Sequence, residues 1–203
     1  MEEYKVLTNL PKDNYFGTWE KKDVKAFGKW FMAEKENRMQ MLFDEIHRDP
    51  EFVEWQPDFS PESLKTLGAW FERNIKWEPM PEDEFQEFIK KYKGMARYEN
   101  KWITTKSESL VFDVSIYFGE VLLRALGDRK WKQLLNVSIR NYDYGCMYIP
   151  FLPPHPHRLI VTPWRIVWSL AVDLIHYPNL KEGGIYPRYM KTYESLKERL
   201  KSV

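Results

Sequence analysis

The sequence of 203 residues contains a single cysteine, Cys146, so it can form no internal disulfide and no CxxC metal or redox motif. It also lacks a long apolar run, because Asp113, Glu120 and Asp173 interrupt the longest stretches. None of these approaches the roughly 18 apolar residues that span a bilayer. The first residues, Met1 to Lys5, have no apolar core of the kind found in signal peptides. We therefore predict a cytoplasmic protein with Cys146 as a small apolar strand residue.

The chain has no excess of charge of either sign. It carries 31 lysines and arginines against 30 aspartates and glutamates, for a formal net charge of +1. A chain this close to neutrality has no overall field that attracts nucleic acid or an anionic membrane surface. We predict neither kind of partner, and we interpret the short basic runs at 90–93 and 197–201 as solvated helix faces.

Sequence signatures of catalysis are also missing. The chain has no GxSxG elbow, no HExxH zinc motif and no glycine-rich phosphate loop, since Gly183-Gly184 is not followed by lysine and a hydroxyl residue. We therefore assign no catalytic residue and predict no cofactor. Whether the chain is an enzyme stays open at this point.

Aromatic residues, in contrast, are abundant: nine tryptophans, 12 tyrosines and 12 phenylalanines make up 16% of the chain. Large rings bury much area and favour cores and recognition surfaces. A chain of this length buries roughly 70% of its unfolded surface, so it needs no disulfide or metal to stabilise it. No low-complexity linker divides it. We expect a single globular domain, 1–203, in which residues 1–22 form an arm.

Apolar periodicity, prolines and capping residues predict about six helices, beginning near residues 23, 60, 81, 107, 162 and 187. Leu135, Val137 and Ile139 alternate with polar residues, which predicts a half-buried strand. After a turn at 141–145, residues 146–152 would return as its partner, and 159–161 would add a short strand. The fold class that we expect is α+β and predominantly helical. A small antiparallel sheet would accompany helices packed around a buried central helix.

That central helix is the segment from Ser107 to Gly127, with Ser107 or Ser109 as its cap and Gly127 at its end. It is apolar around most of its circumference, which predicts burial on nearly all sides. The exceptions are four side chains that spacings of four, three and four place on one narrow face, the polar stripe: Asp113, Tyr117, Glu120 and Arg124. The stripe either lines a recognition pocket or is a solvent-facing strip with a Glu120–Arg124 ion pair.

The histidines suggest a weaker possibility. His155-Pro156-His157 has an HxH spacing that occurs in metal sites, and Asp173 with His176 on the following helix would supply further ligands. The competing interpretation is that these are exposed loop histidines, because no HExxH motif or Cys/His cluster accompanies them.

Two runs of sequence resemble known bacterial families. Residues 55–64 (WQPDFSPESL), continued by 67–71 (LGAWF), resemble a pattern in small uncharacterised bacterial proteins. Residues 116–121 (IYFGEV), through Gly127 and Trp131 and followed by a hairpin, resemble a helix-then-strands unit of uncharacterised and immunity-type bacterial families. Immunity proteins bind and neutralise a toxin domain. The resemblance covers under half the chain, implies a bacterial cytosolic protein that binds another protein, and brings no catalytic residues.

The leading hypothesis is therefore a non-enzymatic protein-binding protein, an immunity-type inhibitor of a bacterial toxin. The abundance of Trp, Tyr and Arg supports it, because these residues are favoured at binding hot spots. The alternative is a small metal-dependent enzyme that uses the carboxylates of the polar stripe with His155 and His157, which requires these groups to converge in one pocket. A third possibility is a structural subunit. The sequence predicts no oligomeric state.

Overall fold

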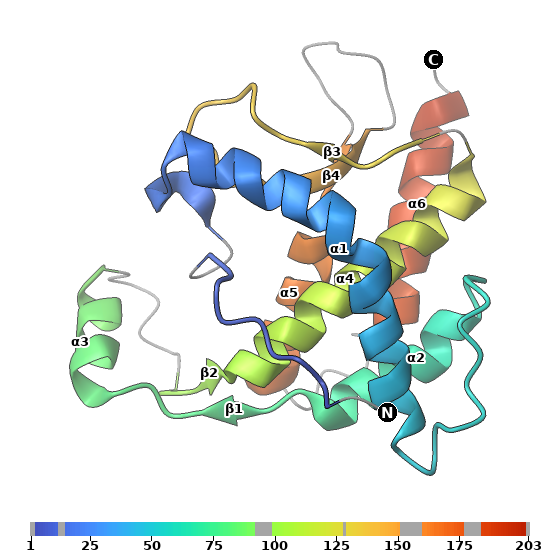
Figure 1. The fold of residues 1–203 in the computed structure, drawn as a ribbon, viewed down its shortest axis with the longest axis horizontal. Coiled ribbons are helices and arrows are strands. Elements are labelled where there is room, and N and C mark those ends of the chain that lie inside the picture. Colours follow the sequence, from blue (N-terminus) through green and yellow to red (C-terminus); the bar gives the residue numbers. More distant parts are fainter. Residues whose placement is uncertain are drawn as a thin grey trace.

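The computed structural model describes residues 3–11, 15–91, 99–127, 129–150, 160–176 and 184–201, and within them the chain is mostly helical (Figure 1). The helices are α1 (Lys21–His47), α2 (Ser63–Asn74), α3 (Glu82–Lys91), α4 (Thr105–Leu126), α5 (Pro163–His176) and α6 (Ile185–Lys201). The strands are β1 (Trp77–Glu78), β2 (Trp102–Ile103), β3 (Lys132–Gln133), β4 (Met147–Pro150) and β5 (Ile160–Val161). They form two small antiparallel sheets, in the orders β1-β2 and β3-β4-β5. The α+β class is confirmed.

Helix α4 is the centre of the molecule, as its apolar circumference predicted. From Ser107 to Leu122, every residue except Glu108 and Glu120 is buried. Helices α1 and α5 pack along it, and α1 crosses it diagonally in Figure 1. Helices α2 and α6 complete the surroundings of α4. The expected ring-rich core is present: the ring of Phe112 lies 5.1 Å from that of Trp164 and 5.9 Å from that of Phe31, centroid to centroid.

The cap of α4 differs from the prediction. Thr104 is the N-cap residue, and its side-chain oxygen accepts a hydrogen bond from the amide of Ser107. Ser107 and Ser109 lie inside the helix, where their hydroxyls accept hydrogen bonds from the amides of Lys76 and Leu7. These serines therefore attach neighbouring segments to α4 instead of beginning it. At the other end, Gly127 follows the helix with φ of +72°, a conformation that glycine adopts without strain.

The strand predicted at 135–139 is wrong. Pairing with the returning chain ends at Leu134, which donates to Cys146 and accepts from Gly145 through their backbones. Beyond Leu134 the chain makes two successive turns, closed by hydrogen bonds from Asn141 to Ser138 and from Tyr144 to Asn141. These turns use the backbone groups locally, so no strand ladder forms there. The next two predicted strands are confirmed in their described parts. Strand β4 begins at Met147, one residue later than predicted, and β5 is Ile160–Val161, while 151–152 and 159 lie outside the described residues.

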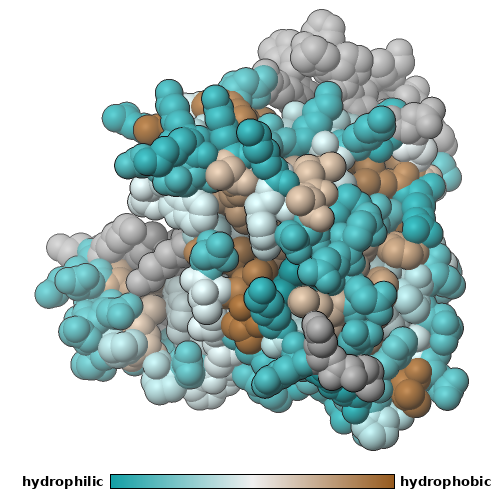
Figure 2. All heavy atoms as spheres, in the orientation of Figure 1, coloured by the Kyte–Doolittle hydropathy of each residue, from teal (hydrophilic) through white to brown (hydrophobic). Residues whose placement is uncertain are grey.

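The N-terminal segment packs against the body of the molecule. Tyr4 and Leu7 are buried, and in Figure 1 residues 3–11 run in front of α4. Helix α3 lies at the edge of the molecule and connects to the body through β1. Figure 2 shows that hydrophilic side chains cover most of the visible face, with small hydrophobic patches between them. Among the described residues, no helix combines the length and hydropathy that crossing a membrane requires.

Candidate functional site

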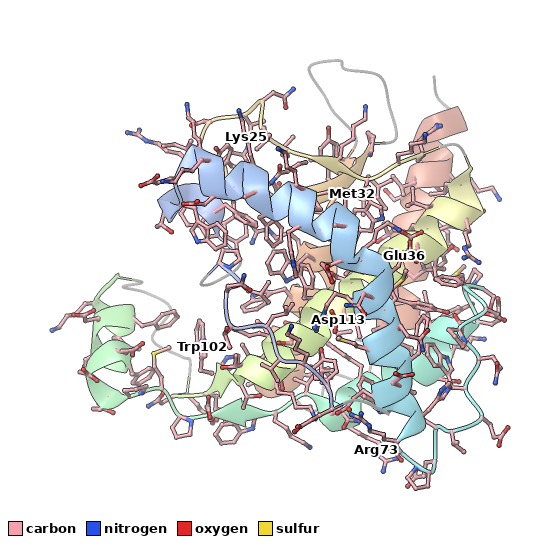
Figure 3. The ribbon with its side chains drawn as sticks, in the orientation of Figure 1. Lys25, Met32, Glu36, Arg73, Trp102 and Asp113 are labelled. Carbon is pink, nitrogen blue, oxygen red and sulfur yellow. The ribbon has the colours of Figure 1, made fainter. Side chains whose placement is uncertain are left out.

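Asp113, the first residue of the polar stripe, is completely buried between α4, α1 and the N-terminal segment (Figure 3). Its carboxylate accepts two hydrogen bonds from the Arg38 guanidinium, Nε to Oδ1 at 2.8 Å and Nη2 to Oδ2 at 2.6 Å. The hydroxyl of Tyr4 donates to Oδ2 at 2.6 Å. Burial raises the pKa of Asp113 to about 6, although Arg38 acts in the opposite direction. Burial and the Asp113 charge together raise the pKa of Tyr4.

Tyr117, the second stripe residue, holds the segment that leads into α2. Its hydroxyl accepts a hydrogen bond from the amide of Phe59 at 3.1 Å and lies 2.7 Å from Oγ of Ser63. Ser63 donates its own proton to the carbonyl of Ser60, so the Tyr117 hydroxyl is the donor to Ser63. Phe59 has φ of +59°, which is uncommon for a residue other than glycine. Tyr117 therefore fixes a strained turn, and burial raises its pKa.

Glu120 and Arg124 complete the stripe without pairing to each other. Oε1 of Glu120 accepts hydrogen bonds from Nζ of Lys35 at 3.0 Å and from the indole of Trp131 at 2.9 Å. The guanidinium carbon of Arg124 lies 3.5 Å from the ring centroid of Phe59, a cation–π contact. The four side chains of the stripe are thus engaged with α1, the N-terminal segment, the chain before α2 and Trp131. Asp113 and Tyr117 are buried, Glu120 is half-buried and Arg124 is exposed, so the stripe joins elements of the fold and reaches the surface at Arg124.

The three histidines of the metal hypothesis are only partly described. His155 and His157 lie outside the described residues. His176 lies at the end of α5 near Glu99 and Lys101, and its pKa is lowered first by burial and then by the Lys101 charge. In the described part of the chain, no group of three or more His, Cys, Asp or Glu side chains is arranged to hold a metal ion.

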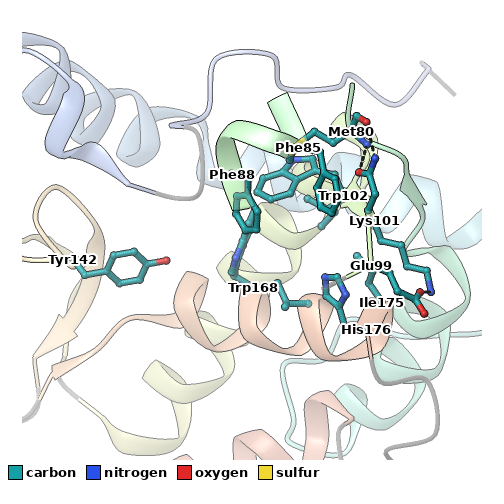
Figure 4. A pocket seen from close by; sticks show the side chains of 13 residues that line it. Met80, Phe85, Phe88, Glu99, Lys101, Trp102, Tyr142, Trp168, Ile175 and His176 are labelled. Atoms are coloured by element: carbon teal, nitrogen blue, oxygen red, sulfur yellow. Dashed lines mark hydrogen bonds and ion pairs between the residues drawn. The ribbon is translucent and has the colours of Figure 1, made fainter. Parts of the chain in front are cut away.

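His176 lines a cavity of about 260 Å³ between α3, β2 and α5, which we call the α3–α5 cleft (Figure 4). None of the four stripe residues lines it. Its lining is mainly aromatic and aliphatic: Met80, Phe85, Phe88, Trp102, Ile103, Tyr142, Trp168, Val172 and Ile175, with Glu99, Asn100, Lys101 and His176 as the polar members. The structure therefore separates the stripe carboxylates from His176.

Sequence reasoning missed this cleft, although part of its signal was present. Phe85 and Phe88 lie three residues apart on α3, and Trp168 and Val172 lie four apart on α5, so each pair shares one helix face. What the sequence did not reveal is that these two faces meet across β2. Asn100 supports this arrangement through two hydrogen bonds to the backbone of Met80. Its Oδ1 accepts from the Met80 amide at 2.9 Å, and its Nδ2 donates to the Met80 carbonyl at 3.0 Å.

The loop at residues 134–144, which we call the apolar loop, is a second unpredicted surface feature. Leu135, Ile139 and Tyr142 are large apolar residues with exposed fractions of 36%, 48% and 53%. The alternation that predicted a buried strand face instead places Leu135 and Ile139 in solvent. Three large apolar residues exposed within one short loop are a candidate interaction surface.

The apolar loop is held in place by several contacts. The guanidinium of Arg165 lies 3.4 Å from the ring centroid of Tyr142, and the Tyr15 ring stacks near the same ring at 6.2 Å. The Tyr15 hydroxyl donates to the carbonyl of Ile139, and Arg165 forms an ion pair with Asp143 at 3.4 Å. The exposed side chains therefore project from a loop whose backbone is already fixed.

Comparisons with protein-family models, with curated proteins and with solved structures find no match to this chain.

Proposed function

We propose that this chain is a non-enzymatic protein-binding protein that engages its partner through the apolar loop. The observation that carries the proposal is the exposure of Leu135, Ile139 and Tyr142 on a loop fixed by Arg165 and Tyr15. Removing apolar surface from water stabilises a complex by about 25 cal/mol for each Å² that is covered. A partner that covers these three side chains therefore gains binding free energy from them.

The fixed backbone of the loop also supports the proposal. Ordering a flexible loop on binding costs free energy, whereas a loop already held by hydrogen bonds and stacking loses little freedom. Tyr142 and Arg165 belong to the residue types that are enriched at binding hot spots. The Arg165 side chain is itself only 14% exposed and packs against the ring of Tyr142, so Tyr142 offers the exposed contact area and Arg165 holds its ring in place.

An immunity-type inhibitor of a bacterial toxin is the specific form of this function that we propose. The resemblance of residues 116–121, through Gly127 and Trp131, to a helix-then-strands unit of uncharacterised and immunity-type bacterial families supports it. The partner would then be a toxin domain, and the apolar loop would cover part of that domain.

The experiment is affinity capture from a lysate of the source cell with three forms of the chain. Wild type is compared with Ile139→Ser and with the control Val53→Ser, because Val53 is 48% exposed, as Ile139 is, but belongs to the turn at 51–54. Both changes remove an exposed apolar side chain and should leave the unfolding midpoint nearly unchanged.

We expect wild type and Val53→Ser to retain the same partner, and Ile139→Ser to lose at least nine-tenths of it, on the order of 1.4 kcal/mol. Retention of the partner by Ile139→Ser as strongly as by wild type would remove the apolar loop from the proposal. Capture of no protein by wild type would overturn the binding function itself. If the partner is a toxin, co-expression with wild type should restore growth and co-expression with Ile139→Ser should not.

A further inference from the structure

The α3–α5 cleft is a recess that the protein-binding proposal does not use, apart from its margin at Tyr142. Figure 4 shows the rings of Phe85, Phe88, Trp102 and Trp168 gathered on one side of the recess, with His176 and the Glu99–Lys101 pair at the other. The rings of Phe88 and Trp102 lie 6.0 Å apart at 72°. Aromatic walls at such angles offer both faces and edges to a third ring.

The size of the cleft restricts what it can hold. Sites for drug-sized ligands have volumes of about 300–1,000 Å³, and the cleft, at about 260 Å³, lies just below that range. An apolar protein cavity of about 150 Å³ holds benzene. The cleft therefore suits a compound of one or two fused rings and is too small for a nucleotide or a large cofactor.

The polar end of the cleft carries no net charge. Lys101 forms an ion pair with Glu99, and its ammonium also lies 5.0 Å from the ring centroid of Trp77. His176, beside them, has a pKa lowered by burial and by Lys101, which favours the neutral imidazole at neutral pH. A charged ligand would meet no uncompensated opposite charge among these groups and would lose hydration on entering. A neutral ligand with one hydrogen-bonding group loses much less.

We propose that the α3–α5 cleft is a binding site for a small neutral aromatic compound of one or two fused rings. Its rings lie among Phe88, Trp102 and Trp168, and its polar group lies at the end formed by His176 and the Glu99–Lys101 pair. This site is separate from the protein-binding function, and either can fail without the other.

Indole is the probe for the test, titrated into the ¹⁵N-labelled full chain while the indole N–H signals of its tryptophans are followed by NMR. Tryptamine and indole-3-acetate, which add a positive and a negative charge to the same ring system, are the ligand controls. Ligand efficiencies predict a dissociation constant for indole of about 0.1–1 mM. The signals of Trp102 and Trp168, assigned by single Trp→Phe variants, should shift most.

The variant that tests the location is Val172→Phe, which enlarges a half-buried side chain that borders the cleft. It should weaken indole binding at least tenfold while the chain stays folded, because the added ring takes the space that the ligand needs. Val53→Phe adds the same atoms at an exposed turn and should bind indole as wild type does. If Val172→Phe does not fold, Trp168→Ala replaces it, and loss of the stacking surface should weaken binding at least fivefold.

Both charged analogues should bind at least fivefold more weakly than indole. The proposal is overturned if indole does not bind wild type, if Val172→Phe and Trp168→Ala bind it unchanged, or if either charged analogue binds as tightly as indole. A partner protein that is lost on Val172→Phe, and that indole does not displace, would show that a protein side chain occupies the cleft. That result would also overturn the assignment.

Discussion

Arg38 on α1 binds Asp113 on α4 at two points, through hydrogen bonds of 2.8 and 2.6 Å, and both side chains are almost completely buried. The same guanidinium donates to the carbonyl of Lys5 at 2.6 Å and to the hydroxyl of Tyr4 at 3.1 Å. One charged pair therefore joins three separate parts of the chain. Truncating either partner of such a pair is costly, because the charge that remains is buried without its hydrogen-bonding partners.

Asp113→Ala should lower the free energy of unfolding by about 3–5 kcal/mol, since it leaves the Arg38 charge buried and unpaired. The loss should appear as a lower urea midpoint measured by circular dichroism. The N-terminal segment should also become more accessible to protease, because Tyr4 loses its acceptor.

The matched control replaces both partners. The double variant Arg38→Met/Asp113→Leu removes the two charges together and fills their space with apolar side chains, so it should cost much less than Asp113→Ala alone. If the double variant is the less stable of the two, the pair contributes a large net stabilisation and the expectation is wrong.

The stability of the chain should also depend on pH through Asp113. Burial raises the pKa of Asp113 from 3.8 to about 6, so the folded state holds this proton more tightly than the unfolded state does. The stability that this group contributes is complete below its unfolded pKa and is lost as the pH rises through about 6.

The comparison uses Asp113→Asn, which has no proton to lose at this position. Between about pH 4 and about pH 7, the free energy of unfolding of wild type should fall relative to that of the variant. Urea titrations of both proteins at a series of pH values give this difference, in which the other carboxylates cancel. A difference that stays constant, or that rises with pH, would show that Arg38 outweighs burial at Asp113.

Tyr117 and Tyr189 allow one chemical change to be tested in two environments. Tyr117→Phe leaves the amide of Phe59 without its acceptor, which should cost about 1–3 kcal/mol and speed hydrogen exchange at Phe59. Within the part of the chain that the structure describes, the buried hydroxyl of Tyr189 has no hydrogen-bond partner, so Tyr189→Phe should be neutral or stabilising. Urea unfolding of both variants checks the opposite signs. Equal losses would mean that the Tyr117 hydroxyl has no particular role.

The burial of α4 could be predicted from the sequence because it follows from the residues of one continuous segment. Apolar residues around a whole helix leave it no stable position except the interior, and Gly127 marks its end. The polar stripe was also visible, since spacings of four, three and four residues along one helix define a face. Its environment was not: Arg38 and Asp113 lie 75 residues apart in sequence, and only the packing of α1 on α4 brings them together.

The apolar loop shows the opposite case, in which a local pattern was misleading. Alternating apolar residues at Leu135, Val137 and Ile139 satisfy the strand pattern, but turns at Ser138 and Asn141 take the backbone groups that a ladder would need. Patterns within one stretch of sequence predict neither of the two candidate functional surfaces. The apolar loop breaks the strand pattern, and the α3–α5 cleft joins two helix faces that no sequence spacing relates.

Gly119 and Gly68 make a matched pair of glycines inside helices. A Cβ at Gly119 would overlap the indole ring of Trp131 and lie 3.2 Å from Pro163, so Gly119→Ala should displace Trp131 and cost about 1–3 kcal/mol. A Cβ at Gly68 would lie 3.5 Å from the backbone of Ile185, an ordinary contact, so Gly68→Ala should gain roughly 0.5–1 kcal/mol from helix propensity. Urea midpoints of the two variants should therefore move in opposite directions. A stabilising Gly119→Ala would mean that the Trp131 ring can shift freely, and its hydrogen bond to Glu120 would then not fix its position.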